Sequence, residues 1–171
     1  MEHAGYEELL DRLLIRMIDW EKGRPGRIQH LLKVHAFAEL IGKGEGADDH
    51  TLFLLRTLGY IHDLGIKTSE EREGYYNAKT QEKYGAIEAR KVLTELGFAP
   101  EDVDRVSYVV GIHHTYDSGE TGMDFRILLE ADACVNMYEK DASEKAKYAM
   151  LEDVFRTGTG KCIFKTMFGL D

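Results

Sequence analysis

The sequence has few of the features that mark disulfide-rich or membrane-spanning proteins. Its 171 residues include two cysteines, two prolines and one tryptophan. Two cysteines, Cys134 and Cys162, are too few for a disulfide scaffold, and reduced thiols in a cytoplasmic protein are the simpler interpretation. No apolar run approaches the roughly 20 residues that a membrane span needs. The acidic start MEHAGYEELL lacks a basic segment followed by an apolar one, so we expect no signal peptide.

The sequence also has fewer basic than acidic residues. The chain has 22 Lys and Arg against 31 Asp and Glu, which gives a net charge of −9 with neutral histidine. Binding to DNA or RNA polymers, or to an anionic membrane surface, needs cations that neutralise phosphates. We therefore expect neither kind of partner. Apolar residues make up 43% of the chain, which is enough to bury a core without disulfides and excludes a disordered chain.

The scarcity of proline and the excess of leucine and alanine over valine and isoleucine favour helices over strands. Apolar residues recur at helical spacing in segments bounded by glycines or prolines. These segments predict helices over about residues 6–21, 27–41, 49–64, 81–96, 100–113, 124–139 and 143–155, with a short one in the polar connection 68–80. We expect one all-α domain over residues 1–171, a compact helical bundle of about six to eight helices. The helix 6–21 and the segment 143–171 would pack on its core.

Two histidines lie where an apolar helix face or a helix end is expected. At about 100° per residue, His30 shares the buried stripe of its helix with Val34 and Ile41. A single histidine on such a stripe is more often a satisfied core residue than a ligand. The pair His62-Asp63 ends an apolar helix, and a helix end beside a core holds ligands rigidly.

Two further groups complete the set of candidates. Asp132 shares a face of its expected helix with Leu128, and a carboxylate on an apolar stripe is costly unless it is paired or bound to a metal. Glu130 lies on the other side of this helix and is expected to be solvated. His113 and His114 end another expected helix, where either can face inward, and the alternative is an exposed pair in a loop.

Two histidines and two aspartates would thus project from three inward helical faces. Mixed imidazole and carboxylate ligands suit Mn, Fe, Co, Ni or Mg better than structural zinc. Four protein ligands on an octahedral ion leave two positions for water and substrate. An ion in such a site can polarise a phosphoryl oxygen and lower the pKa of a bound water molecule.

The order His30, His62-Asp63, Asp132 matches the H…HD…D signature of HD-domain metal-dependent phosphohydrolases. The surrounding segments resemble the blocks of this family in the same order: HLLKVHAFAELIG, LRTLGYIHDLG, YGAIEARKVLTELG, GIHHT and LLEADACV. The resemblance covers about residues 27–138 and implies a helical bundle of the HD-domain type. It also implies a hydrolase that acts on a nucleotide or another small phosphorylated metabolite through a water molecule activated by a metal.

The resemblance assigns roles to individual residues. It implies one divalent transition metal (Mn, Fe, Ni or Co, with Mg as an alternative) and four ligands: His30, His62, Asp63 and Asp132. Asp63 would also bridge a second metal or orient the attacking water. The pair His114-Thr115 lies 18 residues before Asp132 and resembles a block in HD hydrolases that split dinucleoside polyphosphates. His114, with His113 as the runner-up, would therefore contact phosphate, donate a proton or bind a second metal.

Two positions depart from the family pattern. Members with two metals usually have a histidine just before the Gly-Ala helix, and Gln81 takes that place here with Glu82 beside it. We therefore expect one ion per chain. Many members have a lysine directly after His-Asp-x-Gly, whereas Ile66 intervenes here and Lys67 follows. The candidates for substrate binding are Lys67, Arg27, Gln81 and Thr115.

Two other functions stay open. Some HD-fold enzymes are oxygenases with two irons, and such an activity needs the second metal site that Gln81 puts in question. A regulatory module that binds a metal or nucleotide without turnover is the other alternative, although an intact ligand set favours an enzyme. A homodimer is also left open. The segment TGTGK at residues 157–161 lacks the spacing of a P-loop, and its role is not assigned.

Overall fold

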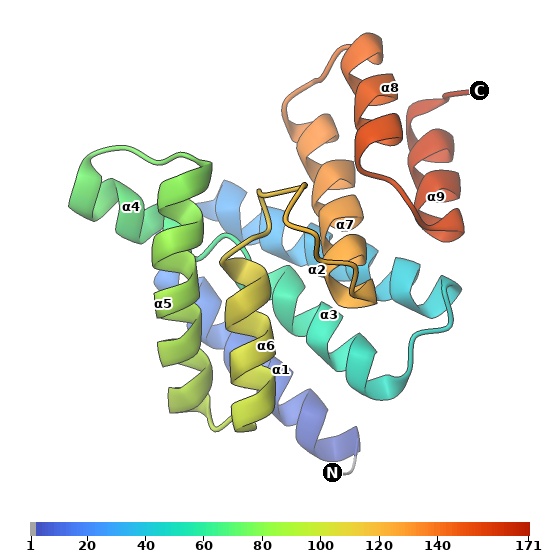
Figure 1. Cartoon of the computed structure of the whole chain (residues 1–171). Coiled ribbons are helices and arrows are strands. Elements are labelled where there is room, and N and C mark those ends of the chain that lie inside the picture. Colours follow the sequence, from blue (N-terminus) through green and yellow to red (C-terminus); the bar gives the residue numbers. More distant parts are fainter. Residues whose placement is uncertain (1–2) are drawn as a thin grey trace.

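The chain forms an all-α bundle in the computed structural model, which describes residues 3–171 (Figure 1). These residues form nine helices and no strand: α1 (His3–Trp20), α2 (Pro25–Gly44), α3 (Asp49–Ile61), α4 (Gly65–Glu73), α5 (Ala78–Leu96), α6 (Pro100–Val110), α7 (Met123–Glu139), α8 (Glu144–Asp153) and α9 (Gly158–Phe168). The predicted all-α architecture is confirmed. The polar connection contributes α4, and the C-terminal tail adds α9, which was not predicted. None of these helices combines the length and the apolarity that crossing a membrane requires.

The helices α2, α3 and α7 form the centre of the bundle (Figure 1). α2 packs on both α3 and α7, while α5 packs on α4 and α6. α1 packs on α3 and α5. α8 and α9 follow α7 at the C-terminal end, and α9 also contacts α2. Segments that are far apart in the sequence, such as α2 and α7, therefore lie side by side.

Apolar side chains from α1 to α7 fill one main core. Its fully buried members include Leu13, Val34, Leu58, Val106 and Leu128. Removing one such side chain from water contributes about 1.5–3 kcal/mol to the stability of the fold. This core fixes the helices relative to one another and makes them a rigid support for the polar residues at its edge.

Two glycines allow neighbouring helices to approach closely. A Cβ on Gly59 of α3 would lie 2.4 Å from the Cα of His35 in α2. A Cβ on Gly65, the first residue of α4, would lie 2.2 Å from the carbonyl oxygen of Gln81 in α5. Any larger residue would push these backbones apart. The contact at Gly65 holds the link between α3 and α4 against the start of α5.

A buried carboxylate attaches the C-terminal helix to α7. Glu130 is fully buried, and its Oε1 atom accepts hydrogen bonds from the backbone N–H groups of Arg156 (2.6 Å) and Thr157 (2.8 Å). Its Oε2 atom accepts one from the Thr157 hydroxyl. The prediction that Glu130 is solvated is wrong, because the tail folds back over this face of α7. The TGTGK segment begins α9, with Thr157 as the N-cap and Glu45 accepting from the backbone N–H of Thr159 at 2.7 Å.

Candidate metal centre

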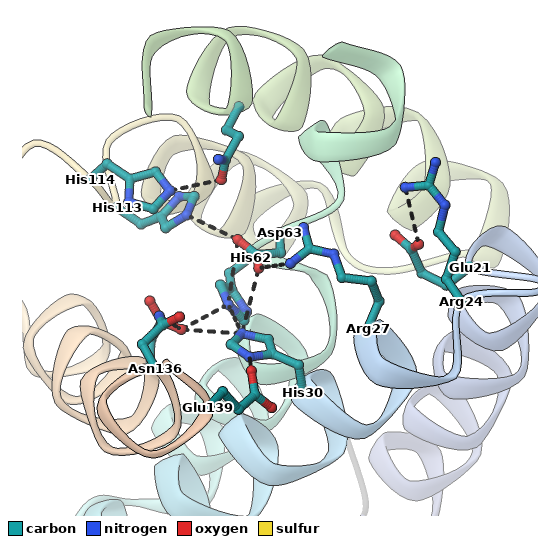
Figure 2. A network of polar contacts seen from close by, with 12 residues as sticks. Glu21, Arg24, Arg27, His30, His62, Asp63, His113, His114, Asn136 and Glu139 are labelled. Atoms are coloured by element: carbon teal, nitrogen blue, oxygen red, sulfur yellow. Dashed lines mark hydrogen bonds and ion pairs between the residues drawn. The ribbon is translucent and has the colours of Figure 1, made fainter. Parts of the chain in front are cut away.

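The four residues predicted as metal ligands meet where α2, α3 and α7 come together. Figure 2 labels three of them: His30, His62 and Asp63. His30 lies in α2, Asp132 lies in α7, and His62 and Asp63 lie in the short link between α3 and α4. His30 and His62 are buried, with 3% and 0% of their surface exposed. The structure thus brings the four side chains together, and their role as ligands stays a prediction.

The nitrogen and oxygen atoms of these residues converge on one point. His30 Nε2 lies 3.2 Å from Asp132 Oδ1 and 3.5 Å from Asp63 Oδ2. His62 Nε2 lies 3.5 Å from Asp132 Oδ1 and 3.7 Å from Asp63 Oδ1. The two Nε2 atoms are 3.4 Å apart. Adjacent ligands on a transition metal, each about 2.0–2.2 Å from the ion, lie about 3 Å apart, so this spacing is close to that of a ligand shell.

The orientation of the imidazoles also fits a cation. The carbonyl oxygen of Gly59 accepts a hydrogen bond from His62 Nδ1 at 3.3 Å, and that of Val110 accepts one from His113 Nδ1 at 2.8 Å. In a neutral ring, a protonated Nδ1 leaves the lone pair on Nε2. The buried His113 Nε2 has no hydrogen-bond partner and lies 3.7 Å from Asp63 Oδ1. Unless a proton or a metal ion lies between them, these two atoms meet as two acceptors.

The histidines and aspartates of this centre shift one another's pKa values. Burial lowers the pKa of His30, but the hydrogen bond to Asp132 and the charge of Asp63 outweigh it and raise that pKa to about 9. Burial raises the pKa of Asp132, but its contacts with the His30 and His62 rings hold that pKa well below its usual range. The pKa of Asp63 is lowered in the same way, although burial opposes it, because His62, His113 and His30 face it. Without an ion, a proton on His30 therefore takes the place of the positive charge.

A second group that could hold a metal ion lies beside the first. Asp63, His113 and His114 each offer an atom within 4.8 Å of the others. His113 turns toward Asp63, whereas His114 Nε2 donates to Gln81 Oε1 at 2.8 Å (Figure 2). Burial and the neighbouring His113 lower the pKa of His114 to about 4, so its ring is neutral at pH 7. Both histidines thus belong to the site, which the sequence alone left open.

The predicted substrate-binding residues fall into two groups. Arg27 lies at the centre, with Nη1 3.3 Å from Asp63 Oδ2, and Gln81 holds His114. Thr115 donates its hydroxyl hydrogen to Glu82, at 3.0 and 3.2 Å from the two carboxylate oxygens. Lys67 is turned to the end of α1, where its ammonium group donates to the backbone carbonyl of Trp20 at 2.8 Å and lies over the indole ring.

Two residues at the centre, Asn136 and Glu139, were not singled out from the sequence, whereas Glu82 was noted there as the neighbour of Gln81. Asn136 Nδ2 donates to Asp132 Oδ1 at 2.7 Å, and Glu139 Oε2 accepts from His30 Nδ1 at 2.9 Å. Both follow Asp132 at helical spacing on α7, and this is the signal that could have found them. Glu82 accepts a hydrogen bond from the backbone N–H of His114 at 2.9 Å and so holds the turn after α6 on α5.

A groove of about 460 Å³ opens beside His30. Its walls come from the start and middle of α2 and the end of α7, and its lining residues are Arg24, Gly26, Arg27, Gln29, His30, Lys33 and Glu139. Three cationic side chains and one carboxylate line it. Cations thus outnumber carboxylates among the residues that line the groove, and each of them has a carboxylate partner: Arg24 has Glu70, Arg27 has Asp63 and Lys33 has Glu139.

Comparisons with known proteins agree with this geometry. The family model described as the HD domain matches residues 27–158. A search of curated proteins found no match. The solved structure of a predicted HD superfamily hydrolase from an uncultured Thermotogales bacterium is 22% identical, with a TM-score of 0.63 over 95% of this chain and 84% of that one. Bacillus subtilis YpgQ is 18% identical, with a TM-score of 0.64 over 96% of this chain and 90% of that one.

The two structural likenesses show a shared fold at low sequence identity. The family model spans the residues that carry all four converging side chains: His30, His62, Asp63 and Asp132. It also covers most of the chain, from the start of α2 to the start of α9. The chain therefore belongs to the HD-domain family.

Proposed function

We propose that this protein is a metal-dependent phosphohydrolase that acts on a nucleotide or another small phosphorylated metabolite. The observation that carries the proposal is the convergence of two imidazole Nε2 atoms and two carboxylates at separations of 3.2–3.7 Å. Membership of the HD-domain family and the fold shared with a predicted hydrolase support it. Substrate class and reaction are inferred from the chemistry of these groups and of the groove.

The ligands of the proposed ion are His30, His62, Asp63 and Asp132, and we expect one divalent transition metal per chain. When bound, such an ion supplies a Lewis acid that polarises a phosphoryl oxygen and lowers the pKa of water. Arg27 holds Asp63 in place through its 3.3 Å contact, and Asp63 is then positioned to orient a water molecule toward phosphorus. His113 and the neutral His114 face the same space and suit hydrogen bonding to the substrate or proton transfer.

The groove beside His30 supports an anionic substrate. An acidic protein repels phosphates at long range, so a phosphorylated substrate needs a local cluster of cations. Arg24, Arg27 and Lys33 line the groove and provide this charge. We also propose a cytoplasmic location, which fits the free thiols of Cys134 and Cys162.

The second group of potential ligands favours one alternative. If Asp63, His113 and His114 hold a second ion, the centre becomes dinuclear, as a hydrolase with two ions or a di-iron oxygenase would require. Two irons per chain would support the oxygenase, and two other divalent ions would support a dinuclear hydrolase. A regulatory module would bind a nucleotide tightly and release no phosphate.

The test is a phosphate-release screen on protein loaded separately with Mn²⁺, Co²⁺, Ni²⁺, Fe²⁺ and Mg²⁺. Nucleotides and small phosphorylated metabolites are the substrates. We expect turnover by the wild-type protein and loss of both metal and turnover in Asp63→Ala. Glu144→Gln, an exposed carboxylate of α8, is the matched control and should keep both. A wild-type protein that binds metal and hydrolyses none of these compounds would contradict the proposal.

A further inference from the structure

Glu139 holds His30 from the side opposite the proposed ion. His30 Nδ1 donates to Glu139 Oε2 at 2.9 Å, while His30 Nε2 faces Asp132 and Asp63 (Figure 2). Asp132 and Glu139 are seven residues apart on α7, which places them on one face two turns apart. One helix thus contacts both nitrogens of the same imidazole ring.

This support differs from that of the other two inward-facing histidines. His62 and His113 donate from Nδ1 to carbonyl oxygens, which lie three residues earlier in the chain. Both contacts are local, and both acceptors are uncharged. His30 instead donates to a carboxylate that is 109 residues away in the sequence. Of the three rings, His30 is the one whose Nδ1 contacts a negative charge.

Glu139 is itself held in place. Its Oε1 atom accepts a hydrogen bond from Lys33 Nζ at 2.6 Å, and Lys33 lies on α2 one turn after His30. The Glu139 side chain is partly buried, with 29% of its surface exposed. Its two oxygens therefore contact different residues of α2. This arrangement restricts the rotation of both the carboxylate and the imidazole ring.

We propose that Glu139 is a positioning residue that orients His30 and strengthens it as a metal ligand. This inference rests on the proposed function, because it assumes that His30 Nε2 binds the ion. A carboxylate acceptor at Nδ1 fixes the proton there, keeps the Nε2 lone pair toward the centre and increases the electron density of the ring. Loss of such a support typically weakens metal binding by about 10- to 100-fold.

The experiment is a calorimetric titration of metal-free protein with Mn²⁺, using the full chain. Glu139→Gln keeps an oxygen acceptor but removes the charge, so we expect the Kd for Mn²⁺ to rise about tenfold. Glu139→Leu removes acceptor and charge, and we expect a rise toward about a hundredfold. Glu144→Gln is the control and should bind like the wild type. The urea midpoint of each metal-free variant shows whether a change in Kd reflects a general loss of structure.

The outcomes separate this inference from the proposed function. If the wild type binds Mn²⁺ and both Glu139 variants keep its Kd, the positioning role is overturned and the metal centre stands. If the wild type binds neither Mn²⁺ nor Co²⁺, Ni²⁺ or Fe²⁺ in the same titration, the metal centre and the inference fall together. If Glu139→Leu does not fold, Glu139→Gln decides the matter, because it replaces the carboxylate by an amide of nearly the same shape.

Discussion

Glu130 and Asp132 lie two residues apart on α7, and both are carboxylates with little exposed surface, yet their surroundings differ. Glu130 accepts hydrogen bonds from two backbone N–H groups and one hydroxyl, all at the start of α9. Asp132 faces the Nε2 atoms of two histidines from other elements and accepts one bond from a side-chain amide. Backbone and hydroxyl donors satisfy the first carboxylate, whereas the second lies beside another carboxylate, Asp63, and the inward-facing Nε2 atoms of two imidazole rings.

This difference separates a structural carboxylate from a candidate metal ligand. N–H and O–H donors from one short segment bind Glu130 and attach that segment to the fold. The imidazole nitrogens and carboxylates that converge from α2, α7 and the link after α3 instead need a shared cation, which is either a proton, as the raised pKa of His30 indicates, or a metal ion. Burial alone therefore does not identify a functional acid. What distinguishes a candidate metal ligand from a structural carboxylate is the chemical nature of the groups that contact it.

The largest effect is expected for Asp132→Ala. Removal of this carboxylate takes away one proposed ligand, so we expect loss of bound metal and a fall in phosphate release of at least about a thousandfold. The metal-free variant should also be less stable than the wild type at pH 7, because the lowered pKa of Asp132 shows that its contacts with His30 and His62 outweigh burial and the repulsion from Asp63. Activity assays and urea unfolding would check both statements. Retention of metal and activity would exclude Asp132 as a ligand.

Glu130→Ala is expected to lower stability while leaving metal binding intact. It leaves the partly buried backbone N–H donors of Arg156 and Thr157 without their acceptor, which should lower the free energy of unfolding by about 3 kcal/mol. The Kd for Mn²⁺ should stay within about twofold of the wild-type value, since Glu130 contacts none of the proposed ligands. Urea unfolding and metal titration measure the two quantities. A stable variant with impaired metal binding would reverse the distinction between the two carboxylates.

Gly160→Ala tests the same attachment from α9. A Cβ at this position would lie 1.9 Å from Glu130 Oε2, so the carboxylate would have to move away from its donors. We expect a loss of about 1–3 kcal/mol in the free energy of unfolding, measured with urea. Gly158→Ala is the matched control, because a Cβ at this position would lie 3.8 Å from the nearest atom, Glu45 Oε1, which is an ordinary van der Waals contact. Equal stability of the two variants would show that the tail tolerates a displaced carboxylate.

The smallest expected effect is a gain, in Glu21→Gln. Glu21 is 2% exposed, and burial raises its pKa although Arg27 and Arg24 oppose this. A carboxyl group with a raised pKa binds more protons in the folded than in the unfolded state, so its contribution to stability falls as the pH rises. The variant should thus be more stable than the wild type at pH 7, by about 0.5–1 kcal/mol. The gain should vanish as the pH falls through the pKa of Glu21. Thermal unfolding of the variant and the wild type from pH 4 to 8 measures this gain. A difference in stability that stays constant, or that grows as the pH falls, would contradict the prediction.

Much of the centre could be predicted from the sequence because it depends on local patterns. Helical periodicity placed His30 and Asp132 on inward faces, and an apolar helix end placed His62-Asp63 beside the core. Glu130 and Glu139 could not be assigned in this way. Their partners are 26 and 109 residues away in the sequence, and periodicity gives the face of a helix but not the segment that covers it. The tail was missed for the same reason, since α9 depends on acceptors from α7 and on Glu45.

The most direct measurement is the metal content of three proteins purified without chelators: the wild type, Asp132→Ala and Glu130→Ala. Elemental analysis should find about one divalent transition metal per chain in the wild type and in Glu130→Ala, and almost none in Asp132→Ala. Treatment with a chelator should remove the ion together with phosphate-releasing activity. Equal metal content in all three proteins, or none in the wild type after reconstitution, would contradict the assignment of the converging histidines and aspartates as a metal centre.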